Sequence, residues 1–225
     1  MKEAYIRFMA PVLPQTTDAL FRIVDKKMRE KVERLHLMIS SPGGMVFQGL
    51  SLYNFLKGAP VEVYTYNFGS VDSIGVVIFC AGDRRFSVPH ARFLIHGVQL
   101  NFHGDQSLDE KGLEEKIKGL KLDYHNIARV IADTTQKPAH KVEEDMNNRT
   151  TLTPQEARDY GLVHEIKSAL FPADADFSVV GEGPQQVPQQ LQIAIPKQLV
   201  PQPVQHVTLP SEQAFTRSAT LDSGT

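Results

Sequence analysis

Two glycine-containing turns, each entered from an apolar stretch and each followed by a helical stretch, constrain this chain more than any other feature. The first turn is SPGG at 41–44, which follows the apolar stretch LHLMIS at 35–40. The second is GSVDS at 69–73, which follows VEVYTY at 61–66. A strand that leads through a turn into a helix is typical of folds in which parallel strands alternate with helices. The sequence therefore predicts an α/β fold with a largely parallel sheet.

The remaining pattern up to residue 170 extends this alternation. Strands are predicted at 4–10, 84–88, 91–96 and 163–166, and helices at 16–35, 46–58, 74–81 and 153–160. A longer helix is predicted from Ser107, with Ser107 and Glu110 as a capping box. Its apolar residues recur at steps of three and four along an otherwise charged helix: Leu113, Ile117, Leu120, Tyr124, Ile127 and Ile131. We expect this helix to project from the core and to meet another element or another subunit.

The composition limits the classes of function. The formal net charge is −2 at neutral pH and the pI is about 6.4, so no basic surface for nucleic acid is expected. A single cysteine, Cys80, excludes an intrachain disulfide and a thiolate metal cluster. The histidines have no paired metal-ligand spacing, so we expect neither a metal nor a cofactor.

The start of the chain, MKEAYIRFMAP, is too polar for a secretory signal, and no run approaches the roughly 18 apolar residues of a membrane span. We therefore expect a cytoplasmic protein with no membrane partner.

The composition changes after about Phe171. Residues 171–225 hold seven of the chain's 14 prolines and nine glutamines. Segments such as PQQVPQQLQ cannot bury enough apolar surface to offset the entropy lost on ordering. We predict one folded domain at 1–170 and a Pro/Gln-rich, disordered tail at 171–225, with disorder most evident from Pro184.

Ser73, His96 and two backbone amides form a candidate catalytic group. A serine hydroxyl becomes a good nucleophile when a base removes its proton, and the attacked carbonyl then needs donors for its negative charge. Ser73 precedes an apolar helix whose first amide, that of Ile74, has no intrahelical acceptor. Gly44 in the first turn lets a second amide approach without a Cβ in the way. His96 ends the apolar strand FLIH and is the candidate base.

Each of these features also has a structural interpretation. A serine before an apolar helix is usually an N-cap, and SPGG is usually a tight turn. A histidine at a strand end is often only a hydrogen-bonded structural residue. The order of the motifs and the strand-turn-helix setting of both glycine turns favour the catalytic interpretation.

At these residues the chain resembles the Clp protease proteolytic subunit. In that family the second glycine of an SPGG turn, here Gly44, supplies an oxyanion amide. The nucleophile lies in a pattern of glycine, three residues, serine, a hydrophobic residue and glycine, which Gly69–Gly75 matches with Ser73 as the serine. The base follows a hydrophobic residue and an isoleucine, which Leu94–His96 matches.

The resemblance covers about residues 3–168. It implies the fold shared by Clp protease and crotonase, with repeated β-β-α units. It also implies that the helix from Ser107 is the handle that brings two rings together.

One position departs from the family pattern. The family has an aspartate shortly before its closing helix, and counting back from that helix places Arg149 there. An arginine cannot orient His96 as a carboxylate does. Three nearby side chains are candidates for that role after a shift of the loop: Asn148, Asn147 and Asp145. An asparagine can hold the required imidazole tautomer. Without such a partner the site is a serine–histidine dyad.

The function implied by the resemblance is an ATP-dependent Clp-type serine endopeptidase. It would cleave unfolded polypeptides inside a homo-oligomeric chamber of stacked rings, by acyl-enzyme chemistry on Ser73. The resemblance also implies an AAA+ unfoldase as partner, although the segment before the first strand is short for the loop with which the family contacts it.

Two alternatives remain open. The first is a noncatalytic ring subunit, which Arg149 favours. The second is a crotonase-type enzyme acting on acyl-coenzyme A, with Asp72 as the nearby acid.

Overall fold

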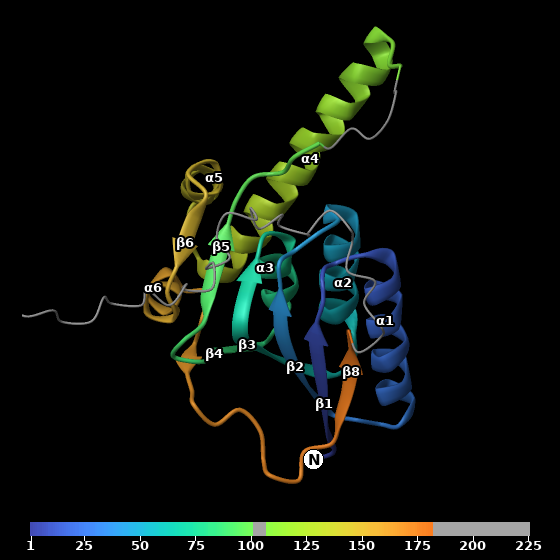
Figure 1. The fold of residues 1–225 in the computed structure, drawn as a ribbon, viewed down its shortest axis with the longest axis vertical. Coiled ribbons are helices and arrows are strands. Elements are labelled where there is room, and N and C mark those ends of the chain that lie inside the picture. Colours follow the sequence, from blue (N-terminus) through green and yellow to red (C-terminus); the bar gives the residue numbers. More distant parts are fainter. Residues whose placement is uncertain (101–106, 182–225) are drawn as a thin grey trace, which may run out of the picture. The chain divides into compact units, whose positions relative to one another are not determined.

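The computed structural model of the chain describes residues 1–100 and 107–181 (Figure 1). The strands are β1 (Glu3–Met9), β2 (Arg34–Ser41), β3 (Glu62–Asp72), β4 (Arg84–Ser87), β5 (Arg92–Ile95), β6 (Thr150–Leu152), β7 (Glu165–Ile166) and β8 (Phe177–Val180). The helices are α1 (Pro14–Arg29), α2 (Val46–Gly58), α3 (Ile74–Phe79), α4 (Glu110–Thr135), α5 (Ala139–Asn147) and α6 (Pro154–Tyr160).

One sheet contains all these strands, in the order β6-β5-β3-β2-β1-β8, while β4 pairs with β3 and with β7. Every pairing is parallel except that of β5 with β6, which is antiparallel. The largely parallel α/β sheet predicted from the sequence is therefore confirmed.

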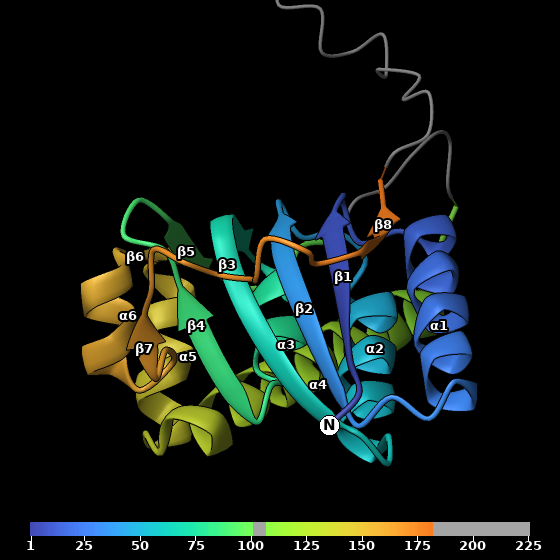
Figure 2. The same ribbon diagram turned by 90° about the horizontal axis from the view of Figure 1, so that it is seen from below.

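The helices α1, α2, α3 and α4 cover one face of the sheet (Figure 2). In β2, Leu35, Leu37 and Ile39 point toward these helices and belong to the main core, because alternate residues of a strand share a face. Met38 points to the opposite face, where it forms a smaller apolar cluster with Tyr66 and Phe86. Both faces of β2 are thus buried, which explains its almost continuous apolar sequence.

Strand β3 changes neighbours halfway along its length. Its first part pairs with β4 up to Asn67, and its second part pairs with β5 from Ser70. The register with β2 shifts at the same place. The buried Asn67 side chain stabilises the change: Nδ2 donates to the Arg92 carbonyl at 2.7 Å, and Oδ1 accepts from the Gly69 N–H at 3.0 Å. The turn predicted at 69–73 is therefore wrong, because β5 supplies partners that keep β3 extended to Asp72.

Helix α4 extends away from the rest of the fold (Figure 1). The structure buries Ile127 and Ile131, whereas Leu113 and Ile117 in its first half are 48% and 43% exposed. The predicted capping box is wrong: Asp109 is the N-cap, and its side chain accepts from the Gly112 N–H at 2.8 Å. The projecting helix itself is present as predicted.

The folded region continues past residue 170, where we placed the end of the domain. Strand β8 pairs in parallel with β1, and Phe177 packs against the smaller apolar cluster on the face of the sheet opposite the helices. The four residues of β8 show only weak alternation of apolar and polar side chains, so the sequence alone did not predict a strand there. The strand forms because it pairs with β1. The segment 182–225 lies outside the described residues, and its expected disorder stays a prediction.

No helix in the part of the chain that the structure describes is both long and apolar enough to cross a membrane.

His36 is a buried titratable group on the face of the sheet opposite the helices. Its ring stacks on Tyr5 with centroids 4.4 Å apart, and Nδ1 lies 2.8 Å from the Tyr66 hydroxyl. Nε2 lies 3.3 Å from a Glu3 carboxylate oxygen without hydrogen-bond geometry. Burial lowers the pKa of His36, and this effect outweighs the opposing effect of Glu3.

This burial predicts a pH-dependent loss of stability. Below the ordinary histidine pKa of about 6.5 the unfolded chain binds a proton that folded His36 resists, so the free energy of unfolding falls as the pH is lowered. One such group changes this free energy by at most about 1.4 kcal/mol per pH unit.

Urea unfolding between about pH 7.5 and 5.5 measures the slope. H36N should reduce it, with the remainder coming from His164, whose pKa is also lowered by burial. H90N removes an exposed imidazole and should keep the wild-type slope. An unchanged slope in H36N would contradict this account.

Candidate active site

Ser73 stands between β3 and α3 in a backbone conformation that few side chains adopt. Its φ is 59° and its ψ is −130°, outside the favoured regions for a residue with a Cβ. Its N–H donates to the Leu94 carbonyl at 2.8 Å, which ties it to β5. Its side chain makes no capping hydrogen bond to α3. Ser73 therefore occupies the N-cap position without capping α3 through its side chain, and its hydroxyl, on a half-buried residue, has no hydrogen-bond partner among the described residues.

The SPGG turn packs directly against this serine. A Cβ on Gly43, whose φ is 87°, would lie 2.6 Å from the Ser73 Cβ and 3.2 Å from its Oγ. A Cβ on Gly44 would collide with the Val12 carbonyl oxygen. Only glycine allows both approaches. The backbone of Gly43 therefore lies against the Ser73 side chain, and the backbone of Gly44 lies against Val12 in the loop after β1.

Two amides near Ser73 are candidate oxyanion donors. Val12 holds the turn by donating to the Gly43 carbonyl at 2.8 Å and accepting from the Met45 N–H at 2.8 Å. Between them the Gly44 N–H has no acceptor among the described residues. Ile74 is the first residue of α3, so its amide has no intrahelical acceptor. That the Gly44 and Ile74 N–H groups donate to one oxyanion stays a prediction.

His96 follows β5 and reaches the same edge of the sheet. Leu94 pairs with Asp72, so the chain arrives at His96 just beyond the level of Ser73. Its Nδ1 lies 2.7 Å from the Gly97 carbonyl oxygen. In the part of the chain described, no hydrogen bond joins His96 to Ser73, so their contact stays a prediction.

Arg149 lies opposite His96, where the resemblance expects a carboxylate. Ile95 pairs with Thr150 in the antiparallel ladder of β5 and β6, and the next step of that register sets His96 against Arg149. Arg149 is exposed, with a φ of 53°. The position is thus the one expected, and its side chain is a cation.

The three candidates for the third catalytic group are placed differently, and Asn147 accepts from the Tyr124 hydroxyl at 3.1 Å. Asp145 is buried, accepts from the Tyr160 hydroxyl at 2.7 Å and pairs with Lys141 at 3.2 Å. Burial and the Asp145 carboxylate raise the pKa of Tyr160, which keeps that hydroxyl a donor. Asn148 is an exposed residue at the end of α5. Among the described residues, none of these three side chains is hydrogen-bonded to His96.

The structure contains an ion pair beside the site that the sequence did not reveal, between a buried carboxylate and an exposed arginine. Asp72 accepts from Arg92 at 2.8 Å and from the Ser70 hydroxyl at 2.7 Å, and it is 6% exposed. This carboxylate therefore joins β3 to β5. The available signals were Asp72 next to Ser73 and Arg92 directly before FLIH, but the pairing of these two side chains depends on the register of β5 against β3.

Neither Cys80 nor a metal site contributes to the candidate chemistry. Burial raises the pKa of the Cys80 thiol to about 11, which keeps it protonated as a core residue. Over residues 1–100 and 107–181, no group of three or more His, Cys, Asp or Glu side chains could hold a metal ion.

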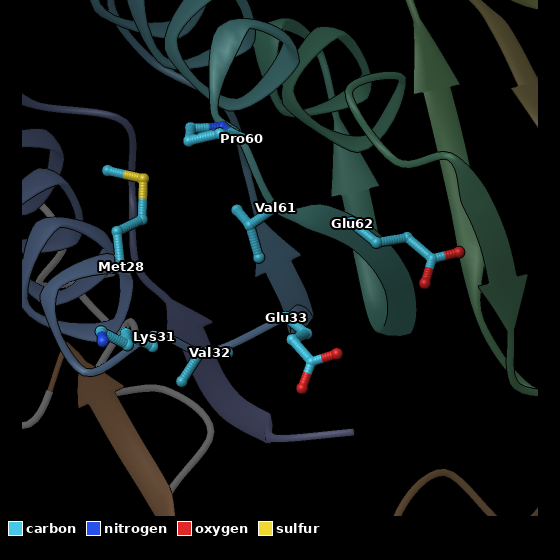
Figure 3. A pocket seen from close by; sticks show the side chains of 7 residues that line it. All are labelled: Met28, Lys31, Val32, Glu33, Pro60, Val61 and Glu62. Atoms are coloured by element: carbon cyan, nitrogen blue, oxygen red, sulfur yellow. The ribbon is translucent and has the colours of Figure 1, made fainter.

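A cavity of about 470 Å³ lies at the opposite end of the sheet (Figure 3). It is lined by Met28, Lys31, Val32, Glu33, Pro60, Val61 and Glu62, at the amino ends of β2 and β3. Ligand sites of parallel sheets form at the carboxyl ends of the strands, where Ser73 lies. We therefore assign this cavity no part in the candidate chemistry.

Comparisons with known proteins agree with the resemblance. A sequence profile described as Clp protease matches residues 1–169. The chain is 33% identical over 136 residues to ATP-dependent Clp protease proteolytic subunit 3 of Rhodococcus jostii, a match covering 60% of this chain and 65% of that protein. It is 32% identical over 136 residues to the ATP-dependent Clp protease proteolytic subunit of Adiantum capillus-veneris, covering 60% and 66%. It is 31% identical over 134 residues to proteolytic subunit 2 of Corynebacterium glutamicum, covering 59% and 65%. The matched region thus spans 65–66% of the length of these relatives.

The contact between Gly43 and Ser73 predicts a specific sensitivity to substitution. In Gly43→Ala the new methyl group meets the Ser73 Cβ and the Asp72 carbonyl oxygen, and the residue must keep a left-handed φ. We expect a loss of about 1–3 kcal/mol in the free energy of unfolding, measured with urea.

Gly58→Ala is the matched control, because a Cβ there meets nothing within 4 Å and the residue ends α2. It should leave stability unchanged or raise it by less than about 1 kcal/mol. Equal stability of the two variants would contradict the close approach.

Proposed function

The chain belongs to the Clp protease family, and we propose that it is a serine endopeptidase that cleaves unfolded polypeptides through an acyl-enzyme on Ser73. The observation that carries this proposal is the strained serine itself. It has a φ of 59°, makes no capping bond, and packs against a turn where only glycine fits. Strain of this kind is retained where the surrounding structure enforces it, and it gathers at functional sites.

The proposed reaction brings together four groups from the carboxyl edge of the sheet. His96 removes the hydroxyl proton as Ser73 Oγ bonds to the peptide carbonyl carbon, and the carbonyl π electrons move to its oxygen. The amides of Gly44 and Ile74 donate to that oxyanion. The carbonyl re-forms as the C–N bond breaks, and the leaving amine takes the proton from His96. Water then hydrolyses the ester by the same steps, so the reaction needs no cofactor.

The proposal includes a homo-oligomeric chamber of stacked rings. The projecting half of α4 carries exposed apolar residues that the described fold does not cover, Leu113, Ile117 and Leu122. A second copy of the chain would bury them. The named relatives are proteolytic subunits of ATP-dependent proteases, so an AAA+ unfoldase as partner and a cytoplasmic location belong to the proposal too.

A noncatalytic ring subunit is the second candidate. Arg149 opposite His96, and the lack of a hydrogen bond between His96 and Ser73 among the described residues, favour it. The crotonase-type alternative is disfavoured, because Asp72 is engaged by Arg92 and Ser70 and is not available as an acid beside the amides.

The test of the peptidase is covalent labelling. An alkyl fluorophosphonate should add to the purified protein, with intact mass showing one adduct per chain and peptide mapping placing it on Ser73. S73A should show no adduct. H96A should label about 100- to 10,000-fold more slowly, because the base is lost. An assembled wild-type protein that forms no adduct would support the noncatalytic candidate instead.

The projecting helix predicts how the oligomer can be broken. Ile117→Glu should reduce the assembled mass measured by light scattering after size exclusion, because a carboxylate replaces an apolar contact. Glu115→Lys changes a residue two positions away, on the opposite side of the helix, and should keep the wild-type mass. An I117E protein of wild-type mass would exclude this helix face from the interface.

A further inference from the structure

We propose that the backbone carbonyl of Gly97 is the positioning group of His96, in the place that a carboxylate takes in a catalytic triad. This inference rests on the proposed function for its catalytic meaning. Its structural part, a fixed imidazole tautomer, can be tested independently.

The hydrogen bond between His96 and Gly97 determines where the ring proton lies. The two atoms are 2.7 Å apart, a strong hydrogen-bond distance. A carbonyl oxygen can only accept, so Nδ1 must carry the hydrogen. A neutral imidazole has one ring hydrogen, which leaves Nε2 with a free lone pair. That is the tautomer a general base needs toward a serine hydroxyl.

The residue that supplies this carbonyl is tethered to α5 and lies beside α4. The Gly97 N–H donates to the Met146 carbonyl at 3.0 Å, which anchors the segment after β5 to α5. The Tyr124 ring of α4 lies 3.5 Å from where a Gly97 Cβ would be. The Tyr124 hydroxyl in turn donates to the Glu143 carbonyl at 2.7 Å, joining α4 to α5. Gly97, which provides the acceptor for His96, is therefore anchored to α5 and bordered by the Tyr124 ring.

A backbone acceptor also explains how the site accommodates Arg149. The buried carboxylate in this region, Asp145, is already engaged by Tyr160 and Lys141. A peptide carbonyl orients the imidazole without needing a negative charge, so a guanidinium across the ladder leaves the tautomer unchanged. A neutral acceptor stabilises the forming imidazolium less than a carboxylate does, so we expect slower acylation than in a full triad.

The tautomer is measured by ¹⁵N NMR of the full-length protein labelled at histidine. H96Q identifies the resonances of His96 by their disappearance. The proposal requires the neutral ring of His96 to carry its hydrogen on Nδ1. A neutral ring protonated on Nε2 would overturn it, whether or not Ser73 reacts with the fluorophosphonate.

The catalytic role is tested by weakening this one acceptor. Replacing Val98 by α-hydroxyisovaleric acid, through nonsense suppression, turns the Gly97–Val98 amide into an ester whose carbonyl accepts more weakly. The Val98 N–H that is lost has no acceptor among the described residues. We expect the second-order rate of Ser73 labelling to fall about three- to tenfold, the effect of one hydrogen bond.

The matched control is an ester two residues further along. Replacing Leu100 by α-hydroxyisocaproic acid alters the Gln99 carbonyl, and neither that carbonyl nor the Leu100 N–H is hydrogen-bonded to a described residue. This control should label within twofold of wild type. A Val98 ester that labels as fast as wild type would overturn the positioning role. A wild-type protein that does not label at all would contradict the proposed function, and the NMR result would then decide the inference alone.

Discussion

The backbone contact between Gly43 and Ser73 is the constraint on which the rest of the site depends. The two residues lie so close that a methyl group on Gly43 would overlap the serine, and Ser73 itself has a positive φ. Such a conformation costs on the order of 1–3 kcal/mol and persists only where neighbours enforce it. Leu94 holds the Ser73 N–H, and Val12 holds the turn. The strands β2 and β5, which pair in parallel with β3 on either side, thus place the Ser73 hydroxyl at the edge of the sheet.

The candidate base depends on a separate part of the molecule. Strand β3 can reach β5 only because Asn67 satisfies the backbone where β3 leaves β4. Strand β5 then carries the chain to His96 at the edge where Ser73 lies, and Gly97 is bonded to α5 and borders α4. Ser73 is therefore positioned by the centre of the sheet, and His96 by β5 and the helices beside it. A change in the packing of α5 is expected to alter the orientation of His96 without moving Ser73.

Features with local causes were predictable from the sequence, and features that need a distant partner were not. Helix α6 was predicted with both ends, because the Thr153 cap and Gly161 act within one turn of the chain. The extension of β3 through 69–72 was missed because its partner strand lies 22 residues further along the chain, and β8 was missed because its pairing with β1 spans the domain. Counting back from the closing helix led to Arg149, and the register of β5 with β6 sets this residue against His96. No side-chain pattern could have shown the Gly97 acceptor, since every residue has a carbonyl.

The central claim is that two amides and one imidazole serve a single hydroxyl, and a crystal structure with a bound peptide boronate tests it most directly. The account predicts a covalent bond from boron to Ser73 Oγ. One boronate oxygen should lie within hydrogen-bond distance of the Gly44 and Ile74 N–H groups, and Nε2 of His96 should face the adduct. A boronate that bonds elsewhere, or whose oxygens all point away from both amides, would contradict it.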